Sequence, residues 1–267
     1  MTPNNIPFKV VIPSRFDSSR LPGKPLLPIA GKPMIQHVVE RAQQCGASET
    51  IVATDDQRIF DVVQNLGYQV LMTSAEHTSG TDRLAEVVKK MNWEDDSIVI
   101  NLQGDEPLIP VVLLSQVAND LSQHTKARVA TLQTRITEAS DLFDPNVVKL
   151  VTDADGYALY FSRAPIPWHR QEFSTLENPT LPNDLKYFRH IGIYGYRASF
   201  LKQYVNWKPS TIETTESLEQ LRVLHYGDKI HVSEASEMPG HGVDTQEDLE
   251  RVEKIMITSG TLNSETE

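Results

Sequence analysis

The stretch FKVVIPSRFDSSRLPGKP, residues 8–25, decides the fold of this chain. Residues 8–12 form a short apolar, β-branched run that stops at Pro13, which is typical of a buried parallel strand followed by a loop. Beyond the loop, Pro33 can open a helix, because the apolar residues after it recur at helical spacing. This order predicts the first strand, loop and helix of a parallel α/β sheet, with the loop at the carboxyl end of the strand.

The same alternation of strand and helix continues through the first half of the chain. We expect a strand at 50–54, then a helix capped by Asp55 or Asp56 that ends before Gly67. Further elements of this kind are a strand at 68–72, a helix at 83–91 and a strand at 97–102. The alternation predicts a doubly wound, mainly parallel α/β sheet, and such sheets bind ligands beyond the carboxyl ends of their strands.

The second half of the chain changes to runs of strands, which predict antiparallel additions to the sheet. These later elements are strands at 129–133, 147–152, 157–162 and 190–196, helices at 197–205 and 213–225, a strand at 229–232, and a last helix from Asp244 or Thr245 to about Ile257. We therefore expect one domain over residues 1–257, with a smaller antiparallel second lobe at about 130–228. The tail at 258–267 is polar and is predicted to be disordered.

Composition narrows the class of protein. The chain has 267 residues, of which 39% are hydrophobic, and this is enough for a sizeable core. Its net charge of −11 argues against binding to a nucleic-acid backbone, which needs broad positive surface. No apolar run approaches the roughly 18 residues that span a bilayer, and the N-terminus does not resemble a secretory leader. The single cysteine, Cys45, excludes an internal disulfide. We expect a globular, cytoplasmic protein that binds neither nucleic acid nor membrane.

The loop after the first strand is locally cationic within this acidic chain. It carries Arg15, Arg20 and Lys24 against one acid, Asp17, and glycine and serine residues lie among them. Guanidinium groups, an ammonium group and backbone N–H groups together can surround a polyphosphate. The loop is neither a G-x-x-x-x-G-K-[ST] loop nor a G-x-G-x-x-G fingerprint. The sequence predicts polyphosphate binding here, and a solvated surface loop is the alternative.

Two carboxylates are candidates for a magnesium site. Asp105 lies in QGDEP, residues 103–107, directly after a predicted strand, and Asp244 lies in the Gly-rich segment PGHGVDTQED, residues 239–248. Mg²⁺ takes one or two protein carboxylates and completes its shell with water and phosphate oxygens. Each residue can equally cap the helix that follows it, and Glu247 would complete a capping box with Asp244. Both interpretations stay open at this point.

Several segments taken together resemble one known family. In chain order they are PSRFDSSRLPGKPL from residue 13, HTSGTDRLAEV from 77, NLQGDEP from 101, YFSRAPIPW from 160, RHIGIYGYR from 189, LEQLRVL from 218 and GVDTQEDLERV from 242. From about Val10 to Val252 the chain resembles the 3-deoxy-D-manno-octulosonate cytidylyltransferases, also called CMP-Kdo synthetases. It departs from their pattern only near its ends and in the loop at 171–183. The resemblance implies an α/β fold of the nucleotide-diphospho-sugar transferase type.

The resemblance also implies a role for each candidate site residue. The nucleotide-binding residues would be Ser14, Arg15, Arg20, Lys24, Ser79, Gly80, Asp82 and Gln103. The sugar-acid-binding residues would be Gln103, Arg163, His190, Tyr194, Glu219 and Gln220. Asp105 and Asp244 would bind Mg²⁺, and together with Arg15 and Lys24 they would be the catalytic residues. Without the family, His190 and Tyr194 would be ordinary side chains of a strand.

The family transfers CMP from CTP to 3-deoxy-D-manno-octulosonate (Kdo), which releases pyrophosphate and activates the sugar for lipopolysaccharide synthesis. The resemblance implies that this chain is a Mg²⁺-dependent enzyme of this kind and a homodimer, with contacts through the second lobe. Three alternatives remain: a cytidylyltransferase for 8-amino-Kdo or a nonulosonate, a nucleotide-sugar glycosyltransferase, and a non-catalytic nucleotide-binding subunit. A glycosyltransferase would normally show an Asp-x-Asp metal motif, which residues 103–106 lack.

Overall fold

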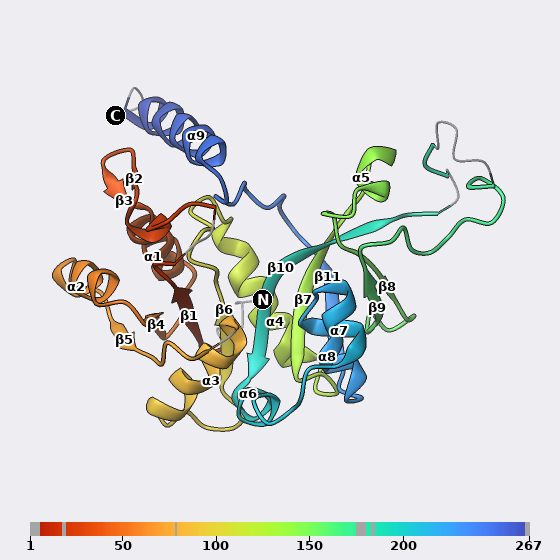
Figure 1. Cartoon of the computed structure of the whole chain (residues 1–267), viewed down its shortest axis with the longest axis horizontal. Coiled ribbons are helices and arrows are strands. Elements are labelled where there is room, and N and C mark those ends of the chain that lie inside the picture. The colour runs from red at the N-terminus through yellow and green to blue at the C-terminus, as the bar shows by residue number, and fades with distance from the viewer. Residues whose placement is uncertain (1–5, 18–19, 78, 175–179, 183–184, 265–267) are drawn as a thin grey trace.

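The computed structural model describes residues 6–17, 20–77, 79–174, 180–182 and 185–264. Its centre is a sheet with the strand order β11-β7-β10-β6-β1-β4-β5, and β8 and β9 extend the sheet beside β10 (Figure 1). Helices pack on both faces of this sheet. The predicted class, a doubly wound α/β fold with a mainly parallel central sheet, is confirmed.

The strands of the main sheet fall into a parallel group from the first half of the chain and an added group from the second, while β2 and β3 form a separate antiparallel hairpin. They are β1 (Phe8–Ser14), β2 (Pro28–Ile29), β3 (Lys32–Pro33), β4 (Glu49–Thr54), β5 (Val70–Met72), β6 (Ile98–Asn101), β7 (Val129–Arg135), β8 (Lys149–Thr152), β9 (Ala158–Ser162), β10 (Phe188–Arg197) and β11 (Ile230–Glu234). β1 is parallel to β4 and β6, whereas β10 is antiparallel to β6, β7 and β8. β11 departs from the predicted antiparallel pattern, because it pairs parallel with β7.

The helices fill the two faces of the sheet. They are α1 (Met34–Gln44), α2 (Gln57–Asn65), α3 (Gly80–Lys90), α4 (Val111–Gln123), α5 (Ala139–Phe143), α6 (Ala198–Tyr204), α7 (Thr211–Glu216), α8 (Gln220–His225) and α9 (Gln246–Ser264), with a 3-10 turn at η1 (Lys24–Leu26). Alternate residues of β1 face opposite sides: Val10 and Ile12 belong to a core with α1, α2 and α4, and Val11 to a core with α3, α6 and α8. A strand that is buried on both faces has a continuous run of apolar residues, which explains why residues 8–12 of β1 are mostly apolar.

Two expectations about helices were wrong in detail, and one helix was not expected. The helix predicted at 213–225 is two helices, α7 and α8, separated at Ser217, whose φ of 53° lies in the left-handed region. The short helix α5 lies between predicted strands and was not expected. The last helix continues to Ser264 rather than ending near Ile257, so the structure places much of the segment predicted to be disordered in a helix; residues 265–267 lie outside the described residues.

The C-terminal helix α9 packs beside the β2–β3 hairpin and α1 (Figure 1). The contact is a small apolar cluster of Leu21, Ile29, Met34, Val243, Leu249 and Val252. Complete burial of one such aliphatic side chain contributes about 1.5–3 kcal/mol, so the contact ties the end of the chain firmly to its beginning. As a result, the segment before α9 crosses the carboxyl ends of β1 and β6 and carries Asp244 to the loop of Lys24.

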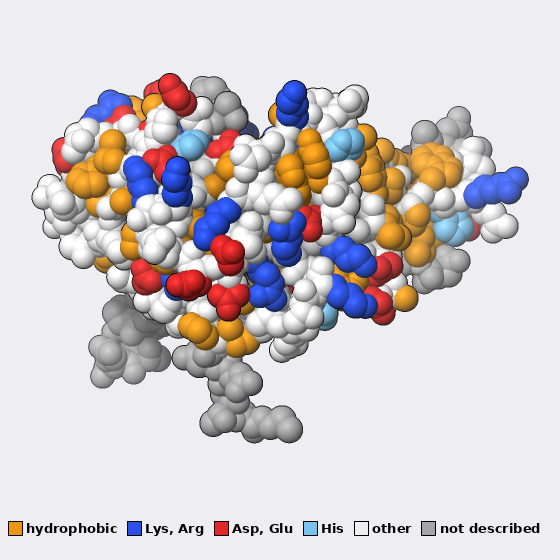
Figure 2. Space-filling model, turned by 90° about the horizontal axis from the view of Figure 1, so that it is seen from below, with side chains coloured by type: hydrophobic (Ala, Val, Ile, Leu, Met, Phe, Trp, Pro, Cys, Tyr) orange, Lys and Arg blue, Asp and Glu red, His pale blue; other side chains and the backbone are white. Residues whose placement is uncertain are grey.

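The surface agrees with the charge and hydropathy of the sequence. On the face seen in Figure 2, Lys and Arg side chains alternate with Asp and Glu instead of forming one broad positive area. In the described part of the chain, no helix is long and apolar enough to cross a membrane.

Candidate active site

The carboxyl ends of β1 and β6 carry the two loops that the sequence singles out. These strands are parallel neighbours, with Val11 opposite Asn101, so both loops leave the same edge of the sheet. Gly104 allows the loops to approach, because a Cβ atom there would lie 2.5 Å from Ser14 Oγ and 3.1 Å from the carbonyl oxygen of Pro13. Any side chain at residue 104 would push the two loops apart.

Lys24 joins the two candidate metal ligands. Its Nζ atom lies 2.6 Å from Asp105 Oδ2 and 3.3 Å from Asp244 Oδ1, and it donates a 2.9 Å hydrogen bond to the carbonyl oxygen of Val243. The side chain of Lys24 is 13% exposed, whereas those of Asp105 and Asp244 are 31% and 51% exposed. One cation therefore lies between two carboxylates that are distant in the sequence and open to a cleft.

Neither Asp105 nor Asp244 caps the helix that follows it, which was the alternative to a role as a metal ligand. Pro110 occupies the N-cap position of α4, so Asp105 does not cap that helix. At the start of α9, Thr245 and Asp248 exchange hydrogen bonds: the backbone N–H of Asp248 donates to Thr245 Oγ1 over 3.2 Å, and Asp248 Oδ2 accepts from the backbone N–H of Thr245 over 3.0 Å. Since this pair satisfies the first turn, the carboxylate of Asp244 is left to bind cations.

Further cations lie along the same cleft. Arg20 NH2 is 3.0 Å from Asp244 Oδ1, and the guanidinium group of Arg15 donates to the carbonyl oxygen of His77. The cleft is lined by Pro13, Ser14, Arg15, Asp17, Arg20, Lys24, Pro25, Ser79, Gly80, Arg83, Gln103, Gly104, Asp105, Glu219 and Asp244. Cations beside carboxylates suit a polyphosphate that arrives with a divalent metal ion.

A second pocket continues from the first, and it is lined by aromatic and polar side chains. Its lining residues are Gly80, Thr81, Asn101, Gln103, Val129, Tyr194, Tyr196, Phe200, Tyr204, Ser217, Leu218, Glu219, Gln220 and Val223. Gly80, Gln103 and Glu219 line both pockets, so the two form one continuous cleft. Gln103 thus lies at the boundary between the charged half and the tyrosine-lined half.

Two tyrosine hydroxyl groups of the second pocket are buried and have no hydrogen-bond partner among the residues that the structure describes. The OH groups of Tyr194 and Tyr204 and the side-chain oxygen of Asn101 have no hydrogen-bond partner within the described residues. Burial raises the pKa of both tyrosines far above the usual value, so these hydroxyls stay protonated at neutral pH. A buried polar group without a partner costs stability, and a ligand rich in hydroxyl groups would satisfy it.

Glu219 provides the only carboxylate among the residues that line the second pocket. Its Oε2 atom accepts a 3.0 Å hydrogen bond from Thr81 Oγ1. Burial raises the pKa of Glu219, and the nearby negative charges of Asp82 and Glu213 add to this effect. The carboxylate oxygens of Glu219 can accept further hydrogen bonds from a ligand in this pocket.

The start of α3 forms the wall between the strands and the cleft. Ser79 is the N-cap of this helix, because its Oγ atom accepts a 3.1 Å hydrogen bond from the backbone N–H of Asp82. Ser79 and Gly80 line the cleft, while the carboxylate of Asp82 accepts a 3.0 Å hydrogen bond from Ser79 Oγ. Asp82 therefore supports the turn that presents Ser79, and it does not itself line either pocket.

Two predicted sugar-acid residues lie outside the described pocket linings. The guanidinium group of Arg163 donates hydrogen bonds of 2.7 Å and 2.9 Å to the carbonyl oxygens of Glu216 and Pro145. His190 lies 3.0 Å from Thr131 Oγ1, and burial lowers the pKa of its imidazole to about 3. A neutral His190 cannot offer a positive charge to a sugar carboxylate at physiological pH.

Sequence reasoning missed Arg83, whose side chain is fully buried in the wall of the cleft. Its NH2 group lies 2.6 Å from Asp55 Oδ2, and its NH1 group donates to Thr73 Oγ1. A charged residue at a buried position of the apolar stripe of α3 is the signal that would have found it, because such a position needs a paired charge. Arg83 ties α3 to the ends of β4 and β5.

A hard divalent cation fits the carboxylates of the charged half. Asp105 and Asp244 already face one cation, the ammonium group of Lys24, through oxygen atoms. Burial, together with the negative charges of Asp105 and Asp244, raises the pKa of Glu106 to about 7. Burial is the larger cause of this shift, and the part that comes from the two aspartates is negative charge that a divalent cation would offset.

Fold and site together define a nucleotidyltransferase, since a doubly wound sheet presents cations and paired carboxylates at the carboxyl ends of its strands. A family model described as cytidylyltransferase matches residues 9–230. A solved structure from Bacillus anthracis, described as a glucose-1-phosphate thymidylyltransferase, shares the fold with a TM-score of 0.61 at 18% identity, over 93% of this chain and 94% of that one. The chain is therefore a member of the cytidylyltransferase family.

More similar proteins define the particular family. Curated relatives named 3-deoxy-manno-octulosonate cytidylyltransferase include one from Nitrosococcus oceani, 55% identical over 94% of this chain and 97% of the relative, and one from Idiomarina loihiensis, 57% identical over 93% and 98%. A solved structure of CMP:2-keto-3-deoxy-manno-octonic acid synthetase complexed with CTP matches with a TM-score of 0.85 and 44% identity, over 95% of this chain and all of that chain. The chain belongs to the 3-deoxy-manno-octulosonate cytidylyltransferase family.

Proposed function

We propose that this chain transfers CMP from CTP to Kdo, which gives CMP-Kdo and pyrophosphate and activates the sugar for lipopolysaccharide synthesis. Family membership supports the reaction, and the solved relative complexed with CTP supports the nucleotide. The observation that carries the proposal is the cluster of Lys24, Asp105 and Asp244, which opens into a cleft that continues past Gln103 to the buried tyrosines.

The reaction joins the anomeric oxygen of the sugar to the α-phosphorus of CTP and breaks the bond between that phosphorus and the oxygen bridging to the β-phosphate. Pyrophosphate leaves with the electron pair of this bond, and the anomeric hydroxyl loses its proton. Such transfers leave little covalent work to the protein, so rate depends on orientation and on neutralisation of charge. A cleft with a charged half and a hydroxyl-lined half supplies both.

The charged half would bind the triphosphate. Arg15, Arg20 and Lys24 would neutralise the departing pyrophosphate, since guanidinium and ammonium groups stabilise charge that develops on phosphate oxygens. The other proposed nucleotide-binding residues are Ser14, Ser79, Gly80, Asp82 and Gln103. Because the loops after β1 and β6 are already packed at Gly104, this half would need little reorganisation when CTP binds.

Asp105 and Asp244 are the residues that would hold Mg²⁺. Their carboxylate oxygens are hard ligands, and two protein carboxylates leave room for phosphate oxygens and water around the ion. When bound, Mg²⁺ supplies Lewis-acid polarisation of the phosphate and of the attacking oxygen. The ion pairs with Lys24 hold both side chains in place until substrate binds.

The second half of the cleft would bind the sugar acid. Its hydroxyl groups would form hydrogen bonds with Tyr194, Glu219, Gln220 and Gln103, because both hydrogen-bond donors and acceptors line this pocket. Arg163 and His190 remain proposed sugar-acid residues. In either case the side chain would have to exchange its present partner for the substrate.

A homodimer through the second lobe, at about 130–228, and a cytoplasmic location complete the proposal. Leu159 on β9 is 60% exposed, and Trp168 beyond the end of that strand is 51% exposed. Exposed large apolar side chains are typical of a surface that another chain covers. Sizing chromatography of the wild type should give twice the mass of the chain, and Leu159→Glu should shift it toward the monomer. A monomeric wild type would contradict the dimer.

A pyrophosphate-release assay tests the reaction directly. The four nucleoside triphosphates are combined with Kdo, 8-amino-Kdo and a nonulosonate, each with Mg²⁺ and with a chelator. We expect release only with CTP, Kdo and Mg²⁺ together. A higher kcat/KM with another acidic sugar would make that sugar, and not Kdo, the substrate. A full rate in the presence of chelator would contradict the dependence on Mg²⁺. If no pair of substrates releases pyrophosphate, the chain does not catalyse this reaction.

A further inference from the structure

A second group of potential metal ligands lies at the amino ends of the parallel strands, whereas the cleft lies at their carboxyl ends. The strand pairings make β11 run in the same direction as β1, because β6, β10 and β7 connect them with two reversals. His231 is close to the amino end of β11, and Asp120 and His124 lie at the carboxyl end of α4. The cleft is at the carboxyl ends of the strands, so this group is separate from the proposed active site.

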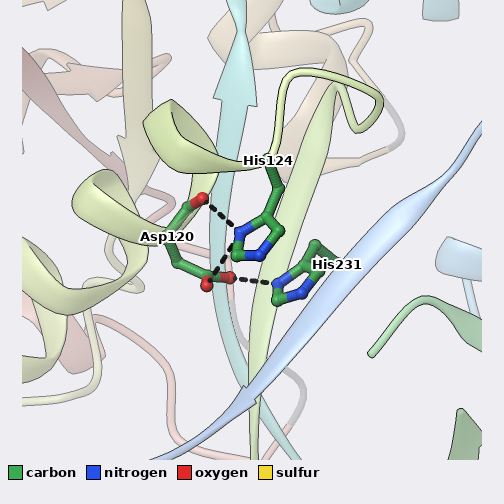
Figure 3. A group of neighbouring side chains, drawn as sticks. All are labelled: Asp120, His124 and His231. Atoms are coloured by element: carbon green, nitrogen blue, oxygen red, sulfur yellow. Dashed lines mark hydrogen bonds and ion pairs between the residues drawn. The ribbon is translucent and has the colours of Figure 1, made fainter. Parts of the chain in front are cut away.

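The three side chains converge from two elements (Figure 3). Asp120 Oδ2 is 2.7 Å from His231 Nδ1, and Asp120 Oδ1 is 3.3 Å from His124 Nδ1. The two imidazole rings are stacked, with 3.4 Å between centroids and 11° between planes, so both turn a nitrogen toward the same carboxylate. One ligand atom from each residue lies within 4.8 Å of the others, and no other group of three such residues occurs within the described part of the chain.

The electrostatics of this group favour a cation. Asp120 is 9% exposed and His231 is 6% exposed. Within the described residues, the ion-pair partners of Asp120 are these two histidines, and neither a lysine nor an arginine is among them. A buried carboxylate without a lysine or arginine partner needs a compensating positive charge in a low-dielectric interior. A bound divalent cation would supply that charge.

We propose that Asp120, His124 and His231 form a binding site for Zn²⁺ or a similar late first-row divalent ion. Two imidazole nitrogens and a carboxylate oxygen are a common ligand set for these ions and a poor one for Mg²⁺. Bonds of roughly 2.0–2.1 Å in a tetrahedral site place ligand atoms about 3.3 Å apart, so the 3.3 Å distance between His124 Nδ1 and Asp120 Oδ1 already fits. The 2.7 Å distance between Asp120 Oδ2 and His231 Nδ1 has to lengthen, and the two rings have to turn out of their stacked arrangement, because an ion bound to an imidazole nitrogen lies close to the plane of the ring. The ion would replace the contacts that the two Nδ1 atoms now make with Asp120, which are 2.7 Å from His231 to the carboxylate and 2.9 Å from His124 to the backbone carbonyl oxygen.

The surroundings provide access for the ion and support for its ligands. A surface hollow along α4 and β11, lined by Gln116, Asn119 and Ser233 among others, reaches Asp120 and can bring water to a fourth coordination position. On the other side, Gly156 has a φ of +83°, and a Cβ atom there would lie 2.9 Å from His231 Nε2. A bound ion would clamp the end of α4 to the edge strand β11, which gives it a structural role.

Calorimetric titration of the metal-stripped full chain with Zn²⁺, in excess Mg²⁺ to cover the carboxylates of the cleft, tests the site. We expect one equivalent of Zn²⁺ per chain. The same ion at a hundredfold excess over its Kd should raise the unfolding midpoint by roughly 5 °C. Co²⁺ in place of Zn²⁺ should give the visible absorption of a four-coordinate ion with nitrogen and oxygen ligands.

Variants decide whether these residues are the ligands. His231→Gln and His124→Gln should each weaken Zn²⁺ binding at least tenfold and remove the thermal shift. His225→Gln, at an exposed histidine at the end of α8, is the matched control and should bind like the wild type. If His231→Gln does not fold, the half-exposed His124 gives the same test. No binding by the wild type, or unchanged affinity in both variants, would overturn the proposal; neither result depends on CMP transfer.

Discussion

The two halves of the cleft use opposite physical means to bind one reacting pair. The half at the ends of β1 and β6 relies on charge, with the ammonium group of Lys24 between the carboxylates of Asp105 and Asp244. The half lined by Tyr194 and Tyr204 offers their buried neutral hydroxyl groups, which have no partner in the described part of the chain. Charge suits a polyphosphate and its metal, whereas neutral donors suit a sugar with many hydroxyl groups. Changes in the first half should therefore act mainly on kcat, and changes in the second mainly on the KM of the sugar.

The largest effect should follow from Asp105→Asn, which removes a charge and keeps the shape of the side chain. We expect kcat for pyrophosphate release to fall by about 10²–10³, the loss typical for removal of one preorganised electrostatic group. Asp244→Asn should behave in the same way. Glu247→Gln, which changes an exposed carboxylate in the first turn of α9, is the control and should keep full activity. A kcat within twofold of the wild type in either aspartate variant would place the metal elsewhere.

Tyr194→Phe should give a smaller effect of a different kind. The variant loses a buried hydroxyl that has no partner within the described residues, so its folding stability should not decrease. We expect the KM for Kdo to rise about tenfold, equivalent to roughly 1.4 kcal/mol, while kcat and the KM for CTP stay within twofold. Tyr226→Phe, at an exposed ring outside the cleft, is the control. An unchanged KM for Kdo would remove Tyr194 from the sugar site.

The smallest effect concerns the pH dependence of stability at His190. Burial lowers the pKa of its imidazole from 6.5 to about 3, so between these values the unfolded chain binds a proton that the folded chain does not. Stability from this residue is therefore present above pH 6.5 and is lost as pH falls toward 3, by up to about 1.4 kcal/mol per pH unit. Urea unfolding at pH 7 and pH 5.5 should show a smaller loss in His190→Gln than in the wild type. Equal losses would mean that His190 is protonated in the folded state.

The parallel half of the fold could be predicted because its signals are local. Continuous apolar runs mark strands buried on both faces, and the cap of α2 by Asp56 is confirmed by a 2.9 Å hydrogen bond from the backbone N–H of Arg58. The break between α7 and α8 could not be predicted from the sequence. It depends on a left-handed φ at Ser217, which follows from packing, and a serine residue does not by itself indicate such a conformation. The direction of β11 depends on the route of the whole chain, which no local pattern encodes.

The candidate site shows the same division. The loop that carries Arg15, Arg20 and Lys24 is contiguous, so its charge is visible in the sequence. The convergence of Asp105 and Asp244 was visible only through the family, because α9 must first dock on the beginning of the chain. The polar residues Arg83 and Thr81 are buried in α3, whose apolar spacing predicts only an ordinary core helix. Their hydrogen-bond partners come from distant elements, so the sequence pattern does not indicate them.

A double-mutant cycle on kcat tests most directly whether these two aspartates act as one unit. Asp105→Asn, Asp244→Asn and the double variant are compared by single-turnover pyrophosphate release at saturating Mg²⁺. If both residues hold the same ion, the double variant should be about as slow as each single variant, with a coupling energy of roughly 3 kcal/mol. Losses that multiply, with no coupling between the two positions, would contradict a shared metal site.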